Sequence, residues 1–140
     1  MDRELTENEK KKWYLRGYER AVRQMKRSEL RIRELRLSRI CPAVIADGMP
    51  HASGGSDLSD FIAELDQEER KYMKARYLRV KLCREIMDRI ERLPNEDEKD
   101  VLTFRYIKLM KWEDICAEME FSWKQIHRIH SKALTDFKMT

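Results

Sequence analysis

The sequence predicts an all-α protein in which long N-terminal helices precede a smaller helical module at the C-terminus. Of the 140 residues, 40% are charged and only 9% are aromatic, a balance typical of long, solvent-exposed helices. The four glycines and three prolines are too few for the many tight turns of a strand-rich fold. Apolar residues make up 41% of the chain and recur at helical spacing, which argues against disorder.

The first predicted helix begins at a capping box, in which the side chains of Thr6 and Glu9 each bind a free backbone N–H group of the other. Pro42 disfavours helical geometry at the residue before it, so this helix should end near Ile40. It is therefore predicted to be one unusually long helix. Its apolar stripe passes through Leu15, Tyr18, Val22, Met25, Ile32 and Leu35.

A segment that bears glycines and prolines, residues 41–56, is predicted to be a flexible connector to a second long helix. This second helix should run from near Asp57 to about Leu93. Its predicted apolar stripe passes through Leu58, Ile62, Leu65, Tyr72, Val80, Cys83, Ile86, Ile90 and Leu93.

Charge is arranged in blocks along these two helices. Residues 16–39 carry nine Lys and Arg, residues 57–69 carry six Asp and Glu with no base, and residues 70–92 again carry nine Lys and Arg. An antiparallel hairpin would place the basic end of the first helix beside the acidic start of the second. The pattern also fits helices that pair with a second chain. Residues 1–93 are thus predicted to form a helical hairpin or coiled coil that mediates homo-oligomerisation, with a dimer favoured.

The C-terminal module, residues 94–140, begins with a predicted helix whose N-cap is Asn95. Acidic residues in the first turn, including Glu98, suit the positive end of the helix dipole. This helix should end near Leu109. Its predicted buried residues are Val101, Leu102, Tyr106 and Ile107.

From Trp112 the pattern fits two short helices joined by the three-residue turn Glu120-Phe121-Ser122. Ser122 and Gln125 form a second capping box, which opens the second of these helices. Its residues expected to point inward are Ile126, Ile129, Ala133, Leu134 and Phe137.

The spacing of small and branched residues is what a helix-turn-helix needs. The two helices would cross closely at Cys116, while Ile115 and Ile126 would fill the wedge between them. The first turn residue of such a motif is usually glycine because it needs a positive φ, and here it is Glu120. A residue with a Cβ atom at that position costs about 1 kcal/mol.

The two short helices differ in charge. The first is acidic, and the second carries no acid before Asp136, so the second is the helix that a polyanion would approach. Gln125 can read adenine and Arg128 can read guanine through paired hydrogen bonds, while Lys124 and Lys132 would hold phosphates. The predicted DNA-binding residues are Trp123, Lys124, Gln125, His127, Arg128 and Lys132.

Three side chains of this helix are open to more than one interpretation. Trp123 is either a base or sugar contact or a staple that packs on Trp112, and packing is slightly favoured. His127 and His130 are expected to be surface or boundary residues rather than metal ligands.

Three short motifs in the C-terminal module resemble region 4 of sigma-70-type factors. The resemblance is carried by Leu102-x-x-Arg105-Tyr106-Ile107, by Lys111-Trp112-Glu113-Asp114-Ile115-Cys116, and by Ser122-x-x-x-Ile126-x-Arg128-Ile129-His130-x-x-Ala133-Leu134. More narrowly, the chain is similar to phage and prophage late-transcription regulators of the ArpU/RinA type. The resemblance is good over residues 93–137 and only architectural over residues 1–92.

The resemblance implies that Lys124, Gln125 and Arg128 occupy DNA-contacting positions of the recognition helix. Trp123 and the missing turn glycine depart from the usual sigma pattern. No core-polymerase-binding region is recognisable, which argues against a complete sigma factor.

The sequence thus predicts a DNA-binding transcriptional regulator of phage or prophage type in the cytoplasm of a bacterial host, with host RNA polymerase as a further candidate partner. The alternatives are a small terminase-like DNA-packaging subunit and a helical protein-protein adaptor that does not bind DNA. An enzyme is not expected, because there is no phosphate loop and no nucleophile-base pair on a suitable element. No cofactor, zinc pattern or membrane-spanning run is expected either.

Overall fold

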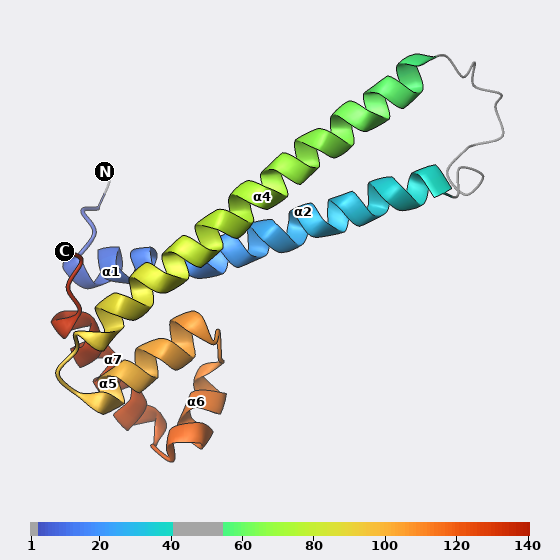
Figure 1. The fold of residues 1–140 in the computed structure, drawn as a ribbon. Coiled ribbons are helices and arrows are strands. Elements are labelled where there is room, and N and C mark those ends of the chain that lie inside the picture. Colours follow the sequence, from blue (N-terminus) through green and yellow to red (C-terminus); the bar gives the residue numbers. More distant parts are fainter. Residues whose placement is uncertain (1–2, 41–54) are drawn as a thin grey trace. The chain divides into compact units, whose positions relative to one another are not determined.

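A computed structural model describes residues 3–40 and 55–140, and these residues form helices and loops without a strand (Figure 1). The predicted all-α class is therefore confirmed for the described part of the chain. Residues 41–54 of the predicted connector lie outside the described residues. The helices are α1 (Glu7–Leu15), α2 (Gly17–Ile40), α4 (Gly55–Glu91), α5 (Glu96–Leu102), the π-helix η1 (Thr103–Ile107), α6 (Trp112–Met119) and α7 (Trp123–Asp136).

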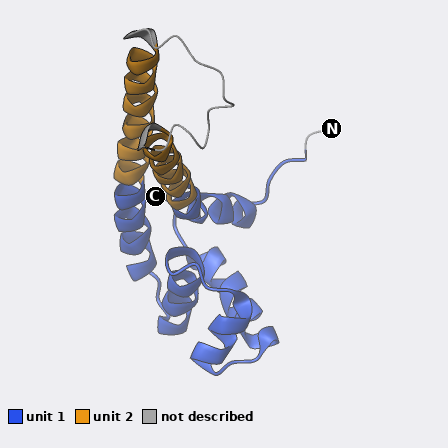
Figure 2. Cartoon of the chain, turned by 90° about the vertical axis from the view of Figure 1, so that its right-hand side faces the viewer, with its two compact units in different colours: residues 1–20, 79–140 blue, residues 21–78 orange. Residues whose placement is uncertain are grey.

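The contacts divide the chain into two compact units (Figure 2). Unit 1 comprises residues 1–20 and 79–140, and unit 2 comprises residues 21–78. Residues 1–20 join the C-terminal helices in unit 1 because α1 packs against α7. The predicted module boundary at residue 93 remains a prediction.

The first predicted helix is interrupted, so the prediction of one long helix is wrong. The capping box at its start is confirmed: the backbone N–H of Glu9 donates to Thr6 Oγ1 at 3.2 Å, and that of Thr6 donates to Glu9 Oε2 at 2.8 Å. α1 nevertheless ends at Leu15, and Arg16 separates it from α2. Gly17 follows the break, and glycine lowers helix stability by about 1 kcal/mol relative to alanine.

Packing against α7 fixes α1 within unit 1. The ammonium group of Lys11 donates to the carbonyl oxygens of Leu134 at 2.8 Å and Thr135 at 3.1 Å, near the C-terminus of α7. The Tyr14 ring lies 6.1 Å from that of Phe137. The two hydrogen bonds from Lys11 satisfy carbonyl groups that the end of a helix leaves without an intrahelical donor. The fully buried side chains of the unit include Leu15, Ile86, Ile90, Val101, Leu102, Ile115, Ile126, Leu134 and Phe137.

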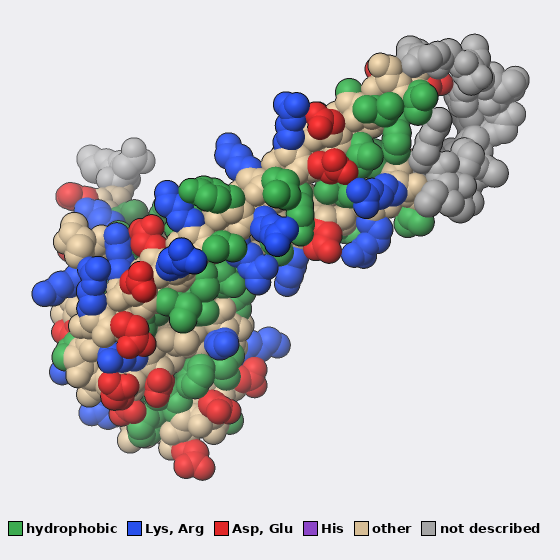
Figure 3. Space-filling view, in the orientation of Figure 1, with side chains coloured by type: hydrophobic (Ala, Val, Ile, Leu, Met, Phe, Trp, Pro, Cys, Tyr) green, Lys and Arg blue, Asp and Glu red, His purple; other side chains and the backbone are tan. Residues whose placement is uncertain are grey.

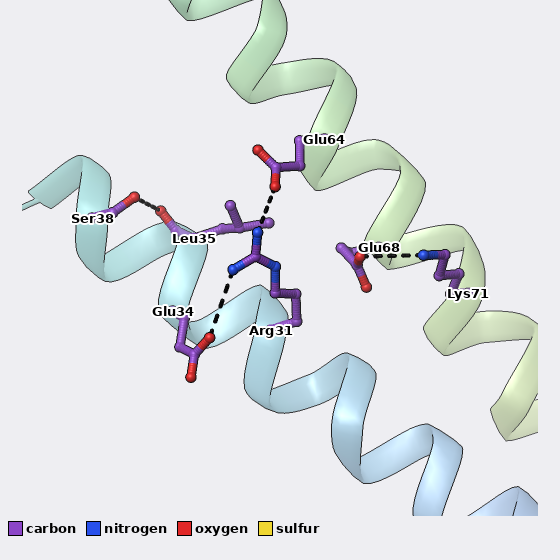
Figure 4. A network of polar contacts seen from close by, with 7 residues as sticks. All are labelled: Arg31, Glu34, Leu35, Ser38, Glu64, Glu68 and Lys71. Carbon is purple, nitrogen blue, oxygen red and sulfur yellow. Dashed lines mark hydrogen bonds and ion pairs between the residues drawn. The ribbon is translucent and has the colours of Figure 1, made fainter.

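In unit 2, α2 and α4 pair within one chain as a hairpin, with Leu35 and Ala75 buried. Arg31 donates to Glu64 at 2.7 Å, and Arg36 donates to Glu69 at 3.1 Å (Figure 4 shows the first pair). The basic end of the first helix thus lies beside the acidic start of the second, one of the two arrangements that the sequence left open.

The predicted apolar stripe of α4 is only partly correct. Ile86, Ile90 and Leu93 are buried as expected. Leu58, Ile62 and Val80 are exposed instead, because packing against a single neighbouring helix buries only a narrow stripe. The residues of α4 that face inward in unit 2 are Phe61, Leu65, Tyr72 and Ala75.

Candidate nucleic-acid interface

The helix before the candidate interface starts as predicted. Asn95 Oδ1 accepts hydrogen bonds from the backbone N–H groups of Asp97 at 2.8 Å and Glu98 at 3.3 Å. α5 ends at Leu102, and the π-helix η1 continues the helical path to Ile107, close to the predicted end near Leu109. Leu109 itself has a φ of 57°.

Arg105 connects η1 to the start of α6. Its Nη1 group donates to the carbonyl oxygen of Met110 at 2.9 Å. Its guanidinium carbon also lies 4.7 Å from the centre of the Trp112 ring, a distance at which a cation and an aromatic face attract each other. Arg105 therefore holds the loop that positions α6.

The turn between α6 and α7 has the left-handed residue that the sequence predicts. Glu120 has φ 57° and ψ 39°, and its backbone N–H donates to the carbonyl oxygen of Cys116. The N–H of Phe121 donates to the same oxygen at 3.2 Å. These bonds satisfy the carbonyl group of Cys116 near the end of α6. They offset part of the free-energy cost of a left-handed residue that is not glycine.

α6 and α7 share a small core with α5. Val101, Ile115 and Ile126 have no exposed surface and pack together. The predicted inward positions of Ile115 and Ile126 are therefore confirmed. The half-buried apolar side chains around them are Phe104, Met110, Trp112, Cys116, Met119, Phe121 and Ile129.

The predicted capping box at the start of α7 is also present. The backbone N–H of Gln125 donates to Ser122 Oγ at 3.2 Å, and the backbone N–H of Ser122 donates to Gln125 Oε1 at 2.9 Å. This second bond engages the side-chain oxygen of Gln125. Paired recognition of adenine needs that oxygen as an acceptor, so in this conformation only the amide nitrogen of Gln125 is available to a base.

The outer face of α7 is basic. Lys124, Arg128 and Lys132 are exposed and follow one another at intervals of four residues, which places them within an arc of about 80°. Ser131 and Thr135, also exposed, lie among them. The backbone N–H groups at the start of the helix add a partial positive charge at the same end as Lys124.

Trp123 and Trp112 both contact His127. The ring centre of His127 lies 4.4 Å from that of Trp123 and 4.8 Å from that of Trp112. Trp123 thus packs on His127, whereas the predicted partner was Trp112, and 56% of the Trp123 surface stays exposed. The Nε2 atom of His127 is buried and makes no hydrogen bond, so it cannot reach a phosphate in this conformation.

His130 is buried, which corrects its predicted surface or boundary position. Its Nε2 atom lies 2.8 Å from the hydroxyl oxygen of Tyr106, and its ring meets that of Trp112 edge-on. Burial, assisted by nearby cationic groups, lowers the pKa of His130 to about 4. Burial likewise raises the pKa of Tyr106 to about 12. His130 follows Ile126 by four residues, and Ala133 and Phe137 follow at further spacings of three and four. This helical periodicity could have identified the position of His130 as internal.

A second buried polar group was not identified from the sequence. Glu98 is buried, and neither of its side-chain oxygens makes a hydrogen bond. Burial and the neighbouring Asp136 raise the pKa of the Glu98 carboxyl group, while Lys132 acts in the opposite direction. Glu98 therefore lies close enough to Asp136 and Lys132, in the C-terminal half of α7, to interact with their charges.

Across residues 3–40 and 55–140, no group of three or more His, Cys, Asp and Glu side chains is placed to hold a metal ion. In those same two segments, no helix combines the length and apolar character that crossing a membrane requires.

One family model matches the chain, over residues 58–138, which is more than half of its length. The family is described as a protein of unknown function (DUF1492). The match begins within α4 and extends past the end of α7, so it includes the whole of the candidate interface. No curated protein and no solved structure matches the chain.

Proposed function

Because the chain belongs to the DUF1492 family, whose description states no activity, we propose a function from the geometry itself: α6 and α7 form a helix-turn-helix that binds double-stranded DNA. In this proposal α7 is the recognition helix and lies in the major groove. The resemblance to ArpU/RinA-type regulators further suggests that DNA binding serves transcription, with host RNA polymerase as a candidate partner.

The observation that carries the proposal is the exposed, basic face of α7. Lys124, Arg128 and Lys132 project from a helix that has no acid before Asp136. The opposite face of the same helix is held by the fully buried Ile126 in the core shared with α5 and α6. An exposed basic helix whose opposite face is held in a core suits binding in a major groove.

The side chains of α7 suit different tasks. Arg128 has a fork of N–H donors that matches the two acceptors of guanine, so it is the proposed base-reading residue. Lys124 and Lys132 are proposed to bind phosphates. Gln125 can donate its amide N–H to a base while its oxygen caps the helix. The exposed ring of Trp123 can pack on a sugar or a base at the groove edge.

The proposal is tested by binding of the full-length protein to a pool of random DNA duplexes, followed by sequencing of the retained fraction. A double variant, Lys124→Ala with Arg128→Ala, should lose the enrichment and most of the affinity. The matched control removes one lysine and one arginine from the exposed surface of α2, by Lys26→Ala and Arg33→Ala. It should bind nearly as tightly as the unchanged protein.

Two results would contradict the proposal. If the unchanged protein retains no DNA at low salt, the helical adaptor becomes the better interpretation. If both double variants lose affinity equally, the interaction depends on total charge rather than on α7.

A further inference from the structure

Helix α4 carries several exposed apolar side chains along one side. Each of six side chains on this helix exposes between 45% and 69% of its surface: Leu58, Ile62, Met73, Tyr77, Val80 and Met87. At 100° per residue, these positions fall within an arc of about 100° along one side of the helix. We call these six residues the α4 stripe. Figure 3 shows apolar side chains exposed along this part of the molecule.

The stripe is a property of one uninterrupted helix, Gly55–Glu91. Its centre lies about 115° around the helix from the inward-facing residues Phe61, Tyr72 and Ala75. The same arc also carries Asp66, Glu69, Arg76 and Arg84, so charged residues separate the apolar ones along the stripe. Single exposed apolar residues are common on soluble proteins, whereas several on one side of a helix are typical of an interaction surface.

The charged residues within and beside the stripe indicate what binds to it. The first part of α4, residues 57–69, carries six acidic residues and no basic ones. The next part, residues 70–84, carries seven basic residues and no acidic ones. A second α4 placed antiparallel would set each acidic part against the basic part of its partner. A parallel placement would set acid against acid and base against base, which disfavours it.

We propose that the α4 stripe binds the same stripe of a second copy of this chain, with the two α4 helices antiparallel. Such a contact uses the same surface on both copies, the arrangement found in two-fold symmetric dimers. It does not depend on the proposed binding of DNA.

The ion pairs already made by α4 are compatible with this partner. Arg31 and Arg36 of α2 pair with Glu64 and Glu69, which lie on opposite sides of the face of α4 that packs on α2, and Glu69 falls within the arc of the stripe. Asp66 pairs with Arg70 one turn along the same exposed helix. Exposed pairs of this kind contribute little to stability, so their side chains can exchange for charges of a second copy.

The first experiment measures the mass of the full-length protein by sedimentation equilibrium across micromolar concentrations. The unchanged protein should be a dimer. The stripe variant, Ile62→Gln with Met73→Gln, should raise the dissociation constant by on the order of 100-fold, because apolar side chains from both copies are lost. The matched control, Leu30→Gln with Leu37→Gln, changes equally exposed apolar residues of α2 and should remain a dimer. Circular dichroism verifies that both variants keep their helices.

The second experiment tests the orientation on the unmodified protein with a zero-length carboxyl-amine cross-linker. Asp66 and Lys81 are 15 positions apart, which is about 22 Å along the helix and too far for a bond within one chain. An antiparallel second copy brings them close together. A covalent link between peptides that contain Asp66 or Glu69 and Lys81 is therefore expected.

The antiparallel orientation also predicts the effect of charge reversal. Arg84→Glu should weaken the dimer about fivefold or more, because it adds an acid opposite the acidic part of the partner. Adding Asp66→Arg to the same chain should restore it. A monomer throughout, a dimer unaffected by the stripe variant, or a dimer lost equally in the α2 control would overturn the proposal. A dimer with neither the Lys81 link nor the rescue would overturn the antiparallel orientation.

Discussion

The hydroxyl oxygen of Tyr106 lies 2.8 Å from Nε2 of His130 in the interior of unit 1. Tyr106 belongs to the π-helix η1, and His130 belongs to the middle of α7, so this contact ties the proposed recognition helix to the helices before it. Their rings also stack, with centres 5.8 Å apart. Because burial keeps the pKa of His130 near 4, the imidazole is neutral around pH 7 and can share one hydrogen bond with the tyrosine hydroxyl group.

The buried imidazole makes stability depend on pH. His130 has a pKa of about 4 in the folded protein, against an ordinary value of 6.5 when unfolded. The unfolded chain therefore binds the proton more readily, and stability should fall as the pH drops from about 6.5 toward 4. The loss attributable to this group is roughly 3 kcal/mol. Urea unfolding of the unchanged protein and of His130→Leu at several pH values should show a smaller pH slope in the variant.

A second variant distinguishes the effect of burial on the pH slope from the effect of the hydrogen bond. Tyr106→Phe removes the hydroxyl group but keeps the ring that covers His130, so its pH slope should stay close to that of the unchanged protein. Equal slopes for the unchanged protein and His130→Leu would show that another group is responsible.

The local signals in the sequence were sufficient to predict several elements. Capping needs only residues three positions apart, so the caps at Thr6, Asn95 and Ser122 could be identified without the fold. The inward positions of Ile115 and Ile126 likewise followed from helical periodicity.

The errors concern features that depend on long-range packing. The helix breaks at Arg16, where α1 ends and packs on α7. A local sequence pattern does not predict this packing between distant segments. The predicted surface or boundary position of His130 is wrong, because its position on the helix is internal. Leu58 and Val80 are exposed because few helices surround α4. Helical periodicity predicts which residues share a face but not how many helices pack around it. In the candidate site, the engagement of the Gln125 oxygen follows from the same capping box that the sequence predicted.

The core beneath α7 should be sensitive to charge. Ile126→Asp places a carboxylate without a partner among Val101 and Ile115, and it should lower the stability of unit 1 by several kcal/mol. Thr135→Asp adds the same side chain at an exposed position of the same helix and should change stability by less than about 1 kcal/mol. Thermal unfolding followed by circular dichroism compares the two variants. Similar melting of both would show that the helix is rotated relative to this structure.

Lys11 should stabilise the end of α7 from outside that helix. Its ammonium group donates to two carbonyl oxygens, so Lys11→Met should cost about 1 kcal/mol of unfolding free energy while it keeps most of the apolar stem. Lys10→Met is the matched control, because Lys10 makes only an exposed pair with Glu7 and should contribute less than about half as much. Chemical denaturation at pH 7 measures both. A larger loss from the Lys10 variant would contradict the assigned role.

The proposed division between Arg128 and Lys132 predicts two different defects in DNA binding. Arg128→Ala should lose about 1–3 kcal/mol on the preferred duplex and relax discrimination at one base pair, because it removes a paired contact to a base. Lys132→Ala should weaken binding to preferred and scrambled duplexes alike, and it should lower the slope of log affinity against log salt by about one unit. Both side chains are exposed on α7, so neither change should unfold the protein. Fluorescence anisotropy at several salt concentrations, with specific and scrambled duplexes, distinguishes the two patterns. If both variants bind like the unchanged protein at every salt concentration, α7 is not the helix that contacts DNA.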